Sequence, residues 1–503
     1  MNLLLITLDQ LRADCLGIAG HHLVTTPSLD RLATNGVRFA RHYSQAAPCG
    51  PGRASLYTGT YQMNHRVVAN GTPLDRRLDN IALMARRAGY APALFGYTDQ
   101  AVDPRSIPDP HDPRRRTWEG VLPGFEVVVE LIGDQLPWRR WLADRGHRVD
   151  TTTTEGPDAA RAALEVLAAE PLRPAEHSHS AFMTDTFLDW LDHRAPEAWF
   201  AHLSYLRPHP PYAAAGEFAT AYHPDDVGDP IAPSPNRHRL HDALCSLDAT
   251  RAPGTSAEMR ELRAQYFGMV SEVDHQLGRI LDHLERSGAD RDTVVVVTAD
   301  HGEQLGDHGY IEKAGFFEQS YHIPAIIADP RHRANHGTVV DDFTENVDIF
   351  ATLCEILDQD IALQCDGLPL TGFIDGSGHP GPWRTAAHYE YDWRFILLGD
   401  DPPPWPWDRR AERCQLSVER ADDYAYVHFA DGDSLYFDLA ADPTWRTTVD
   451  EPAAVLRAAE SMLTWRATHT DRTLADTLVG LFDDGRLAGR LPDAAPGSEP
   501  APQ

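Results

Sequence analysis

The chain has 503 residues, of which 42% are hydrophobic, and a formal net charge of −30. A chain of this length can bury a large core, whereas the negative charge argues against nonspecific binding to nucleic acid. No apolar run is long enough to span a membrane, and the chain enters a strand at once without a basic leader. The cysteines are scattered without disulfide or metal-ligand spacing. We therefore expect a cytoplasmic protein with no signal peptide, no nucleic-acid partner and no membrane association.

Apolar runs and amphipathic segments alternate along most of the chain. Helix signals begin at Thr26-Pro27 and cover residues 81–88, 181–193 and 258–286. Short apolar runs predict strands at residues 3–8, 91–95, 199–205, 293–298 and 323–327. This alternation predicts a doubly wound α/β domain with a mostly parallel sheet, which we assign to residues 1–375.

The pattern changes after residue 375. A helix is predicted at 452–467, and Asp431-Gly432-Asp433 is typical of a hairpin turn. Short runs predict antiparallel strands at residues 386–395, 414–419, 424–429 and 434–438. These features predict a small C-terminal antiparallel subdomain at residues 376–490, followed by a disordered tail at 491–503.

One long connection stands out within the first domain. Residues 213–253 are rich in proline, aspartate and histidine and show no periodic pattern. So long a loop in a compact domain is usually functional or mobile, and we expect it to act as a lid.

The most informative stretch reads APCGPGRASLYTG, with Cys49, Pro51 and Arg53 in the spacing C-x-P-x-R. Pro51 suits the first turn of a helix, so Cys49 should lie at a helix N-terminus, where free N–H groups favour negative charge. Arg53 lies one turn further on the same face. A nucleophile beside a fixed cation indicates a site for anionic esters, although a cysteine in this position can also be a buried structural residue.

This stretch resembles the signature of formylglycine sulfatases and their relatives in the alkaline phosphatase superfamily. The fixed positions are all met, including Thr58 and Gly59 at its end. The resemblance implies that Cys49 is oxidised to formylglycine by a formylglycine-generating enzyme, and that the hydrated aldehyde is the nucleophile. It also implies a homo-oligomer, a tetramer or a dimer.

Acidic and imidazole side chains follow two of the predicted strands. Asp9 comes directly after the strand at 3–8, and Asp300 and His301 follow the strand at 293–298. The carboxyl ends of parallel strands meet at one edge of a sheet, where two carboxylates and an imidazole require a divalent cation. The resemblance implies that modified Cys49 is the remaining ligand. This set suits Mn²⁺ best, with Fe²⁺ and Zn²⁺ as alternatives and Ca²⁺ possible.

Two positions depart from typical sulfatases, which have Asp-Asp in place of Asp9-Gln10 and Asp-Asn in place of Asp300-His301. These departures resemble the phosphonate monoester hydrolases and phosphodiesterases of the same superfamily. We therefore expect hydrolysis of phosphonate monoesters and phosphodiesters, with promiscuous hydrolysis of sulfate esters. The alternative is a sulfatase for aryl or choline-type sulfate esters, because choline sulfatases can also carry an Asp-His pair.

Further residues are expected to bind the small anionic ester. Lys313 is the only lysine in the chain, and His209 lies between prolines at a predicted strand end. We expect His209 to protonate the leaving oxygen, Lys313 to neutralise charge, and Arg53 to hold the nucleophile region and an anionic oxygen. Hydrogen bonds to the remaining oxygens are expected from Asn70, Tyr97 and Thr98, although Tyr97 and Thr98 could equally be core or turn residues.

Overall fold

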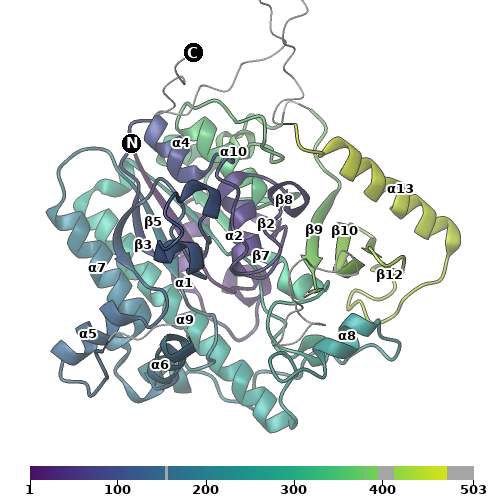
Figure 1. Cartoon of the computed structure of the whole chain (residues 1–503), viewed down its shortest axis with the longest axis horizontal. Helices are drawn as coiled ribbons and strands as arrows, with labels where there is room; N and C mark the ends of the chain where they lie inside the picture. Colours follow the sequence, from purple (N-terminus) through teal and green to yellow (C-terminus); the bar gives the residue numbers. More distant parts are fainter. Residues whose placement is uncertain (153–156, 380, 395–412, 473–503) are drawn as a thin grey trace, which may run out of the picture.

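A computed structural model describes residues 1–152, 157–379, 381–394 and 413–472. Within these residues, eight strands form one sheet and four strands form a second, smaller sheet (Figure 1). The tail at 491–503 lies outside the described residues. The predicted α/β fold with a C-terminal antiparallel sheet is confirmed.

The large sheet has the strand order β4-β3-β5-β1-β6-β7-β2-β8. Every neighbouring pair is parallel except those that include β7, which runs antiparallel to both β6 and β2. The strands are β1 (Asn2–Leu8), β2 (Val37–Tyr43), β3 (Ala93–Gly96), β4 (Glu126–Glu130), β5 (Phe200–Tyr205), β6 (Thr293–Thr298), β7 (His322–Ala328) and β8 (Thr338–Glu345).

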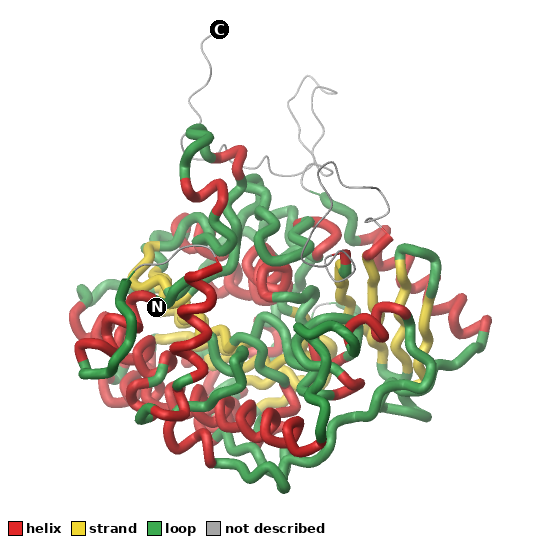
Figure 2. The backbone as a smooth tube through the Cα atoms, turned by 60° about the horizontal axis from the view of Figure 1, so that its bottom comes forward, coloured by secondary structure: helices red, strands yellow, loops and turns green. Residues whose placement is uncertain are grey.

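Helices cover both faces of this sheet, because the side chains of each strand alternate between two cores (Figure 2). In β1, Leu4 and Ile6 lie in one core, and Leu3 and Leu5 lie in the other. The first core contains residues of α1 (Pro27–Thr34), α5 (Leu136–Asp144), α6 (Pro157–Ala168), α7 (His179–His193) and α9 (Ser256–Ser287). The second contains residues of α2 (Cys49–Thr58), α4 (Ile81–Arg87), α10 (Val347–Ile356) and α11 (Thr371–Asp375).

The connection from β6 to β7 explains the one reversed strand. Residues 299–321 form short turns and do not cross a face of the sheet as a helix. The chain therefore re-enters the sheet from the edge at which β6 left it, and β7 must run antiparallel. The whole connection, including Lys313, stays at the carboxyl edge of the central parallel strands.

The small sheet has the order β12-β11-β10-β9 and is antiparallel throughout. Its inner face shares a core with the large sheet, in which Tyr389 and Val418 pack with Tyr43 and Phe343. The helix α13 lies against the outer side through Met462. The elements are β9 (Ala386–Asp392), β10 (Gln415–Ala421), β11 (Tyr424–Phe429), β12 (Ser434–Asp438) and α13 (Pro452–Thr468).

The expected long loop at residues 213–253 is only partly irregular. It contains a 3-10 helix, Gly216–Thr220, and α8, Arg239–Leu244, whose leucines are buried. The N–H of Ile231 donates to the carboxylate of Asp307 at 2.7 Å. The segment is therefore anchored to the domain at several points, and its role as a lid stays a prediction.

Candidate active site

Four neighbouring strands end at the site. The order β3-β5-β1-β6 brings together Tyr97 after β3, His209 beyond β5, Asp9 after β1 and Asp300 after β6. Ligands of open α/β sheets bind at this carboxyl edge, because the loops there diverge and leave polar groups exposed to a common space. The predicted convergence of Asp9, Asp300 and His301 is therefore seen in the structure.

Cys49 is the first residue of α2, after Pro48 at the N-cap. The whole helix is buried, and its first turn packs against the backbone of Asp300, just after β6. A Cβ on Gly52 would lie 2.6 Å from the carbonyl oxygen of Asp300, so only glycine permits this close approach. The two glycines of the CGPGR stretch thus allow the helix to bring Cys49 against the strand ends.

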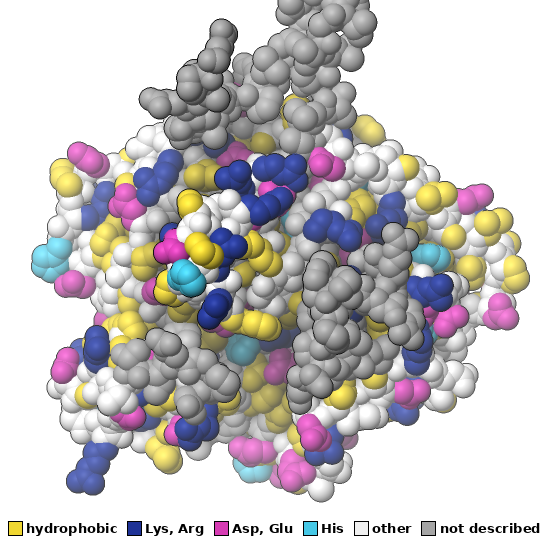
Figure 3. Space-filling model, in the orientation of Figure 1, with side chains coloured by type: hydrophobic (Ala, Val, Ile, Leu, Met, Phe, Trp, Pro, Cys, Tyr) yellow, Lys and Arg dark blue, Asp and Glu magenta, His cyan; other side chains and the backbone are white. Residues whose placement is uncertain are grey.

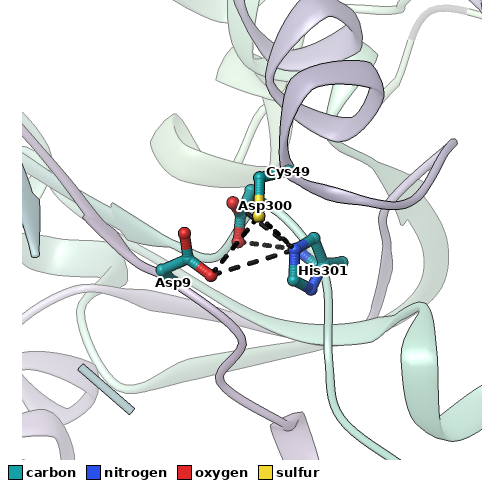
Figure 4. A group of neighbouring side chains, drawn as sticks. All are labelled: Asp9, Cys49, Asp300 and His301. Atoms are coloured by element: carbon teal, nitrogen blue, oxygen red, sulfur yellow. Dashed lines mark hydrogen bonds and ion pairs between the residues drawn. The ribbon is translucent and has the colours of Figure 1, made fainter. Parts of the chain in front are cut away.

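Asp9, Cys49, Asp300 and His301 form a buried group whose candidate ligand atoms all lie within 4.8 Å of one another. Figure 4 shows the carboxylates, the sulfur and the imidazole turned toward a common centre. His301 Nδ1 lies 3.0 Å from the carbonyl oxygen of Gly302, which can only accept a hydrogen bond. Nδ1 therefore carries the proton, and Nε2, 3.2 Å from the Cys49 sulfur, is free to bind a metal ion.

The donor set fits a divalent cation. Two carboxylates, an imidazole and a cysteine, all buried, are costly to hold together without positive charge at their centre. Gln10 does not join this set, since its Oε1 accepts from Lys313 and its Nε2 donates to Glu303. The substitution of glutamine for the second aspartate thus removes one oxygen ligand from the site.

Arg53 lies against the two candidate metal-ligand carboxylates, Asp9 and Asp300, and is completely buried. Its Nε donates to Asp300 at 2.9 Å, and its NH2 nitrogen donates to Asp9 at 3.1 Å. The other terminal nitrogen donates to Ser204 Oγ at 2.7 Å and to the carbonyl oxygen of Tyr97. Arg53 therefore positions the two aspartates, and its donors are directed at the protein rather than toward a substrate oxygen.

The residues around Cys49 favour its protonated thiol form over the thiolate. Burial and the charge of Asp9 raise the pKa of Cys49 well above its ordinary value. Burial would also raise the pKa of Asp9, but nearby positive charges, among them Arg53 and Lys313, lower it below its usual range. Asp9 is thus an anion suited to a cation, whereas Cys49 is not activated as a thiolate nucleophile.

Lys313 and His209 lie beside this group and contact each other directly. Lys313 Nζ lies 2.8 Å from His209 Nε2, and His209 Nδ1 lies 2.7 Å from the carbonyl oxygen of Pro210. Because that carbonyl only accepts, Nδ1 carries the imidazole proton and Nε2 accepts from the ammonium. Lys313 also donates to Gln10 and forms an ion pair with Glu312 at 3.3 Å. Burial and the charge of Lys313 lower the pKa of His209, so His209 is neutral in this pair.

Known proteins share much of this sequence. A family model described as Sulfatase matches residues 1–359. The chain belongs to the sulfatase family. It is 37% identical to the multifunctional alkaline phosphatase superfamily protein PehA of Trinickia caryophylli, and the match covers 94% of this chain and 96% of PehA.

A solved structure and a further relative agree with this assignment. The crystal structure of a phosphonate monoester hydrolase of Agrobacterium radiobacter matches with a TM-score of 0.85 and 40% identity, over 98% of this chain and all (100%) of that chain. An arylsulfatase of Clostridium perfringens is 27% identical over 83% of this chain and 88% of the arylsulfatase. The predicted family is therefore confirmed.

The three expected substrate-binding residues differ in their surroundings. Asn70 Oδ1 accepts from the N–H of Gly50 at 2.8 Å, so Asn70 supports the start of α2 and lies next to Cys49. Tyr97 donates its hydroxyl to Asp9. Thr98 is a correction: its hydroxyl donates to the carbonyl oxygen of Gly120 and accepts from the N–H of Leu122, so it holds a loop.

Several residues near the site were not among the expected catalytic, substrate-binding or metal-binding residues. Ser204 and Gln10 orient Arg53 and Lys313, and Asp99 and Glu119 lie close to the site through loop packing. Figure 3 shows Lys and Arg side chains interspersed with Asp and Glu side chains over the face in view. Among the described residues, no helix combines the length and the apolar character needed to cross a membrane.

Proposed function

We propose that this protein hydrolyses phosphonate monoesters and phosphodiesters, and promiscuously sulfate esters, with a formylglycine formed from Cys49 as the nucleophile. The observation that carries the proposal is the buried group of Asp9, Cys49, Asp300 and His301 with the Lys313–His209 pair beside it. The phosphonate monoester hydrolase of Agrobacterium radiobacter, 40% identical to this chain, supports the choice of phosphorus esters.

Asp9, Asp300, His301 and modified Cys49 would hold one divalent metal ion. When bound, the ion supplies a Lewis acid that offsets the charge of a non-bridging ester oxygen. We propose Mn²⁺, because two carboxylates and one imidazole with few further oxygens suit it better than Ca²⁺. Arg53 contributes by fixing both aspartates in the orientation that this ligand set needs.

Formylglycine explains why a cysteine that remains a thiol occupies the centre of the site. The raised pKa of Cys49, caused first by burial and then by Asp9, makes the unmodified side chain a weak nucleophile. The hydrated aldehyde would supply a hydroxyl group in its place. A formylglycine-generating enzyme is therefore the partner that we propose for maturation.

The remaining residues act on charge and on one proton. Lys313 keeps its charge and neutralises the anionic group that is transferred, while it donates a hydrogen bond to His209 across their 2.8 Å contact. We propose that His209 gives a proton from Nε2 to the leaving oxygen, which requires the imidazole to take up a second proton when the anionic ester binds. Asn70, whose Oδ1 is used by Gly50, keeps its amide N–H groups for an ester oxygen.

The second candidate is a sulfatase proper. It is favoured by the arylsulfatase of Clostridium perfringens and the choline-sulfatase of Rhizobium meliloti, which are 27% and 26% identical to this chain. A cytoplasmic location and a homo-oligomer stay predictions.

The test uses enzyme produced together with its formylglycine-generating enzyme and supplied with Mn²⁺. We would compare kcat/KM for an aryl phosphonate monoester, an aryl phosphodiester and an aryl sulfate, with Cys49→Ala as the control. Preference for the phosphorus esters is expected. Preference for the sulfate would support the second candidate, and equal activity of the control would exclude the proposed nucleophile.

A further inference from the structure

Asp99 presents a buried carboxylate that the proposed reaction does not use. The residue is 3% exposed, and neither carboxylate oxygen has a hydrogen-bond partner within the described residues. Its φ of 50° lies in the left-handed region, which is unfavourable for a non-glycine residue. Asp9 and Asp300, by contrast, are both paired with Arg53. An unpaired buried carboxylate is costly, so its counterpart has to be sought outside the chain.

A second carboxyl group lies next to Asp99 because two loops pair. The N–H of Gln100 and the hydroxyl of Thr98 both donate to the carbonyl oxygen of Gly120, which places Glu119 beside Asp99. Burial and the charge of Glu119 raise the pKa of Asp99. The cation that acts on both acids is Arg53, whose donors are already used by Asp9 and Asp300.

The residue directly before Glu119 carries an exposed aromatic ring. Trp118 is 62% exposed, and a Cβ on Gly71 would lie 2.8 Å from its ring, so the indole rests against Gly71 next to Asn70. An exposed indole beside carboxylates is a surface that attracts organic cations through its negative face.

The position of Asp99 shows which part of a substrate it would meet. A Cβ on Gly50 would lie 3.2 Å from Asn70 Oδ1 and 3.3 Å from the carbonyl oxygen of Asp99, so the backbone of Asp99 packs against the residue after Cys49, and its carboxylate is near enough to raise the pKa of Cys49. In an in-line displacement the leaving group departs opposite the nucleophile, and we assigned that side to Lys313 and His209. Asp99 therefore lies toward a substituent that stays on phosphorus.

We propose that Asp99 and Glu119, bordered by Trp118, form a cation subsite, and that the preferred substrate carries an alkylammonium group on the substituent retained on phosphorus. This inference rests on the proposed function. The ammonium group pairs with the carboxylate of Asp99, which has no partner in the described residues. It also offsets the repulsion between an anionic ester and the two acids.

Two chromogenic esters test the subsite. The 4-nitrophenyl monoesters of 2-aminoethylphosphonic acid and propylphosphonic acid share one leaving group and differ in a terminal ammonium or methyl group. We expect the wild-type enzyme to prefer the ammonium ester in kcat/KM by about tenfold or more. Asp99→Asn should reduce this ratio to about one, and Glu119→Gln should reduce it in part. Because the ratio is taken within each variant, changes in folding or maturation cancel.

Glu126→Gln is the matched control, since this carboxylate is 61% exposed at the edge strand β4, and its ratio should equal that of the wild type. Inhibition by free 2-aminoethylphosphonate and propylphosphonate should give the same preference from binding alone. A wild-type ratio near one, or a preference that survives Asp99→Asn, would overturn the subsite while leaving the proposed function intact. Failure to hydrolyse either ester by formylglycine-containing enzyme would overturn both.

Discussion

Replacing Lys313 with methionine removes the only ammonium side chain and keeps most of its length. Lys313 Nζ lies 2.8 Å from both Gln10 Oε1 and His209 Nε2, and 3.3 Å from Glu312. The variant therefore loses the charge beside the transferred group and the donor that faces His209. We expect catalysis to suffer much more than folding.

The catalytic loss can be estimated from charge alone. Two unit charges about 4 Å apart at an effective dielectric constant of about 20 interact by about 4 kcal/mol. Part of this is lost to desolvation, so a barrier increase of about 3–4 kcal/mol, or a factor of about 10²–10³ in kcat/KM, is expected. The folding cost should be about 1 kcal/mol, because Glu312 is 25% exposed and keeps a contact with Gln10.

The assay measures kcat/KM on an aryl phosphonate monoester, the metal content of the purified enzyme and urea unfolding. Arg31→Met, which removes an exposed cation paired with Asp282, is the control and should leave kcat/KM unchanged. A loss below about tenfold in metal-loaded Lys313→Met would refute the charge argument. A fall in unfolding free energy as large as the rise in barrier would make Lys313 a structural residue.

Four further predictions follow from the pKa shifts and contacts. Burial would lower the pKa of Lys313, but the charges of Glu312, Asp9 and Asp300 raise it above 10.5, so the single ε-¹⁵N-lysine signal should not titrate in NMR spectra below that pH. A midpoint below pH 10 would contradict this. Arg53→Lys keeps the positive charge but loses the guanidinium group that bridges two aspartates. It should lower the unfolding free energy by about 3–5 kcal/mol in urea titrations. A loss under about 1 kcal/mol would show that the bridging geometry is dispensable. Burial raises the pKa of Glu272 to about 7 from 4.5, so the contribution of Glu272 to folding stability falls as the pH rises through this range. Glu272→Gln should therefore be more stable than the wild type by about 2–3 kcal/mol at pH 8, and equally stable near pH 4. Equal stability of the two proteins at both pH values would exclude a buried charge. Dialysis against a chelator should abolish activity and Mn²⁺ should restore it, but not in Cys49→Ala, and mass spectrometry of the metal-loaded proteins should find less bound metal in that variant.

The motif and the strand ends were predictable because their signals are local. Asp9 and Asp300 each follow a short apolar run, and parallel strands align their carboxyl ends whatever their order in the sheet. The spacing of Cys49 and Arg53 is that of one helical turn, so both must lie on one face.

Other elements were missed for physical reasons. The edge strands β4 and β8 carry exposed and charged residues, and their valine runs are only three and two residues long, shorter than the apolar runs of the central strands. The direction of β7 follows from the absence of a crossing helix between residues 299 and 321, and this connection holds Lys313 at the carboxyl edge beside His209.

The sequence alone determined which residue types meet at the carboxyl edge, because periodicity, the helix start at Cys49 and the strand ends are properties of short segments. The tertiary structure decided which neighbours face the site. Thr98 turns toward Gly120, and Asp99 is left unpaired, because successive side chains after β3 point in different directions and the packing of a distant loop fixes their surroundings. The partners of Arg53 were set in the same way, since its contacts lie on strands up to 247 residues away in the chain.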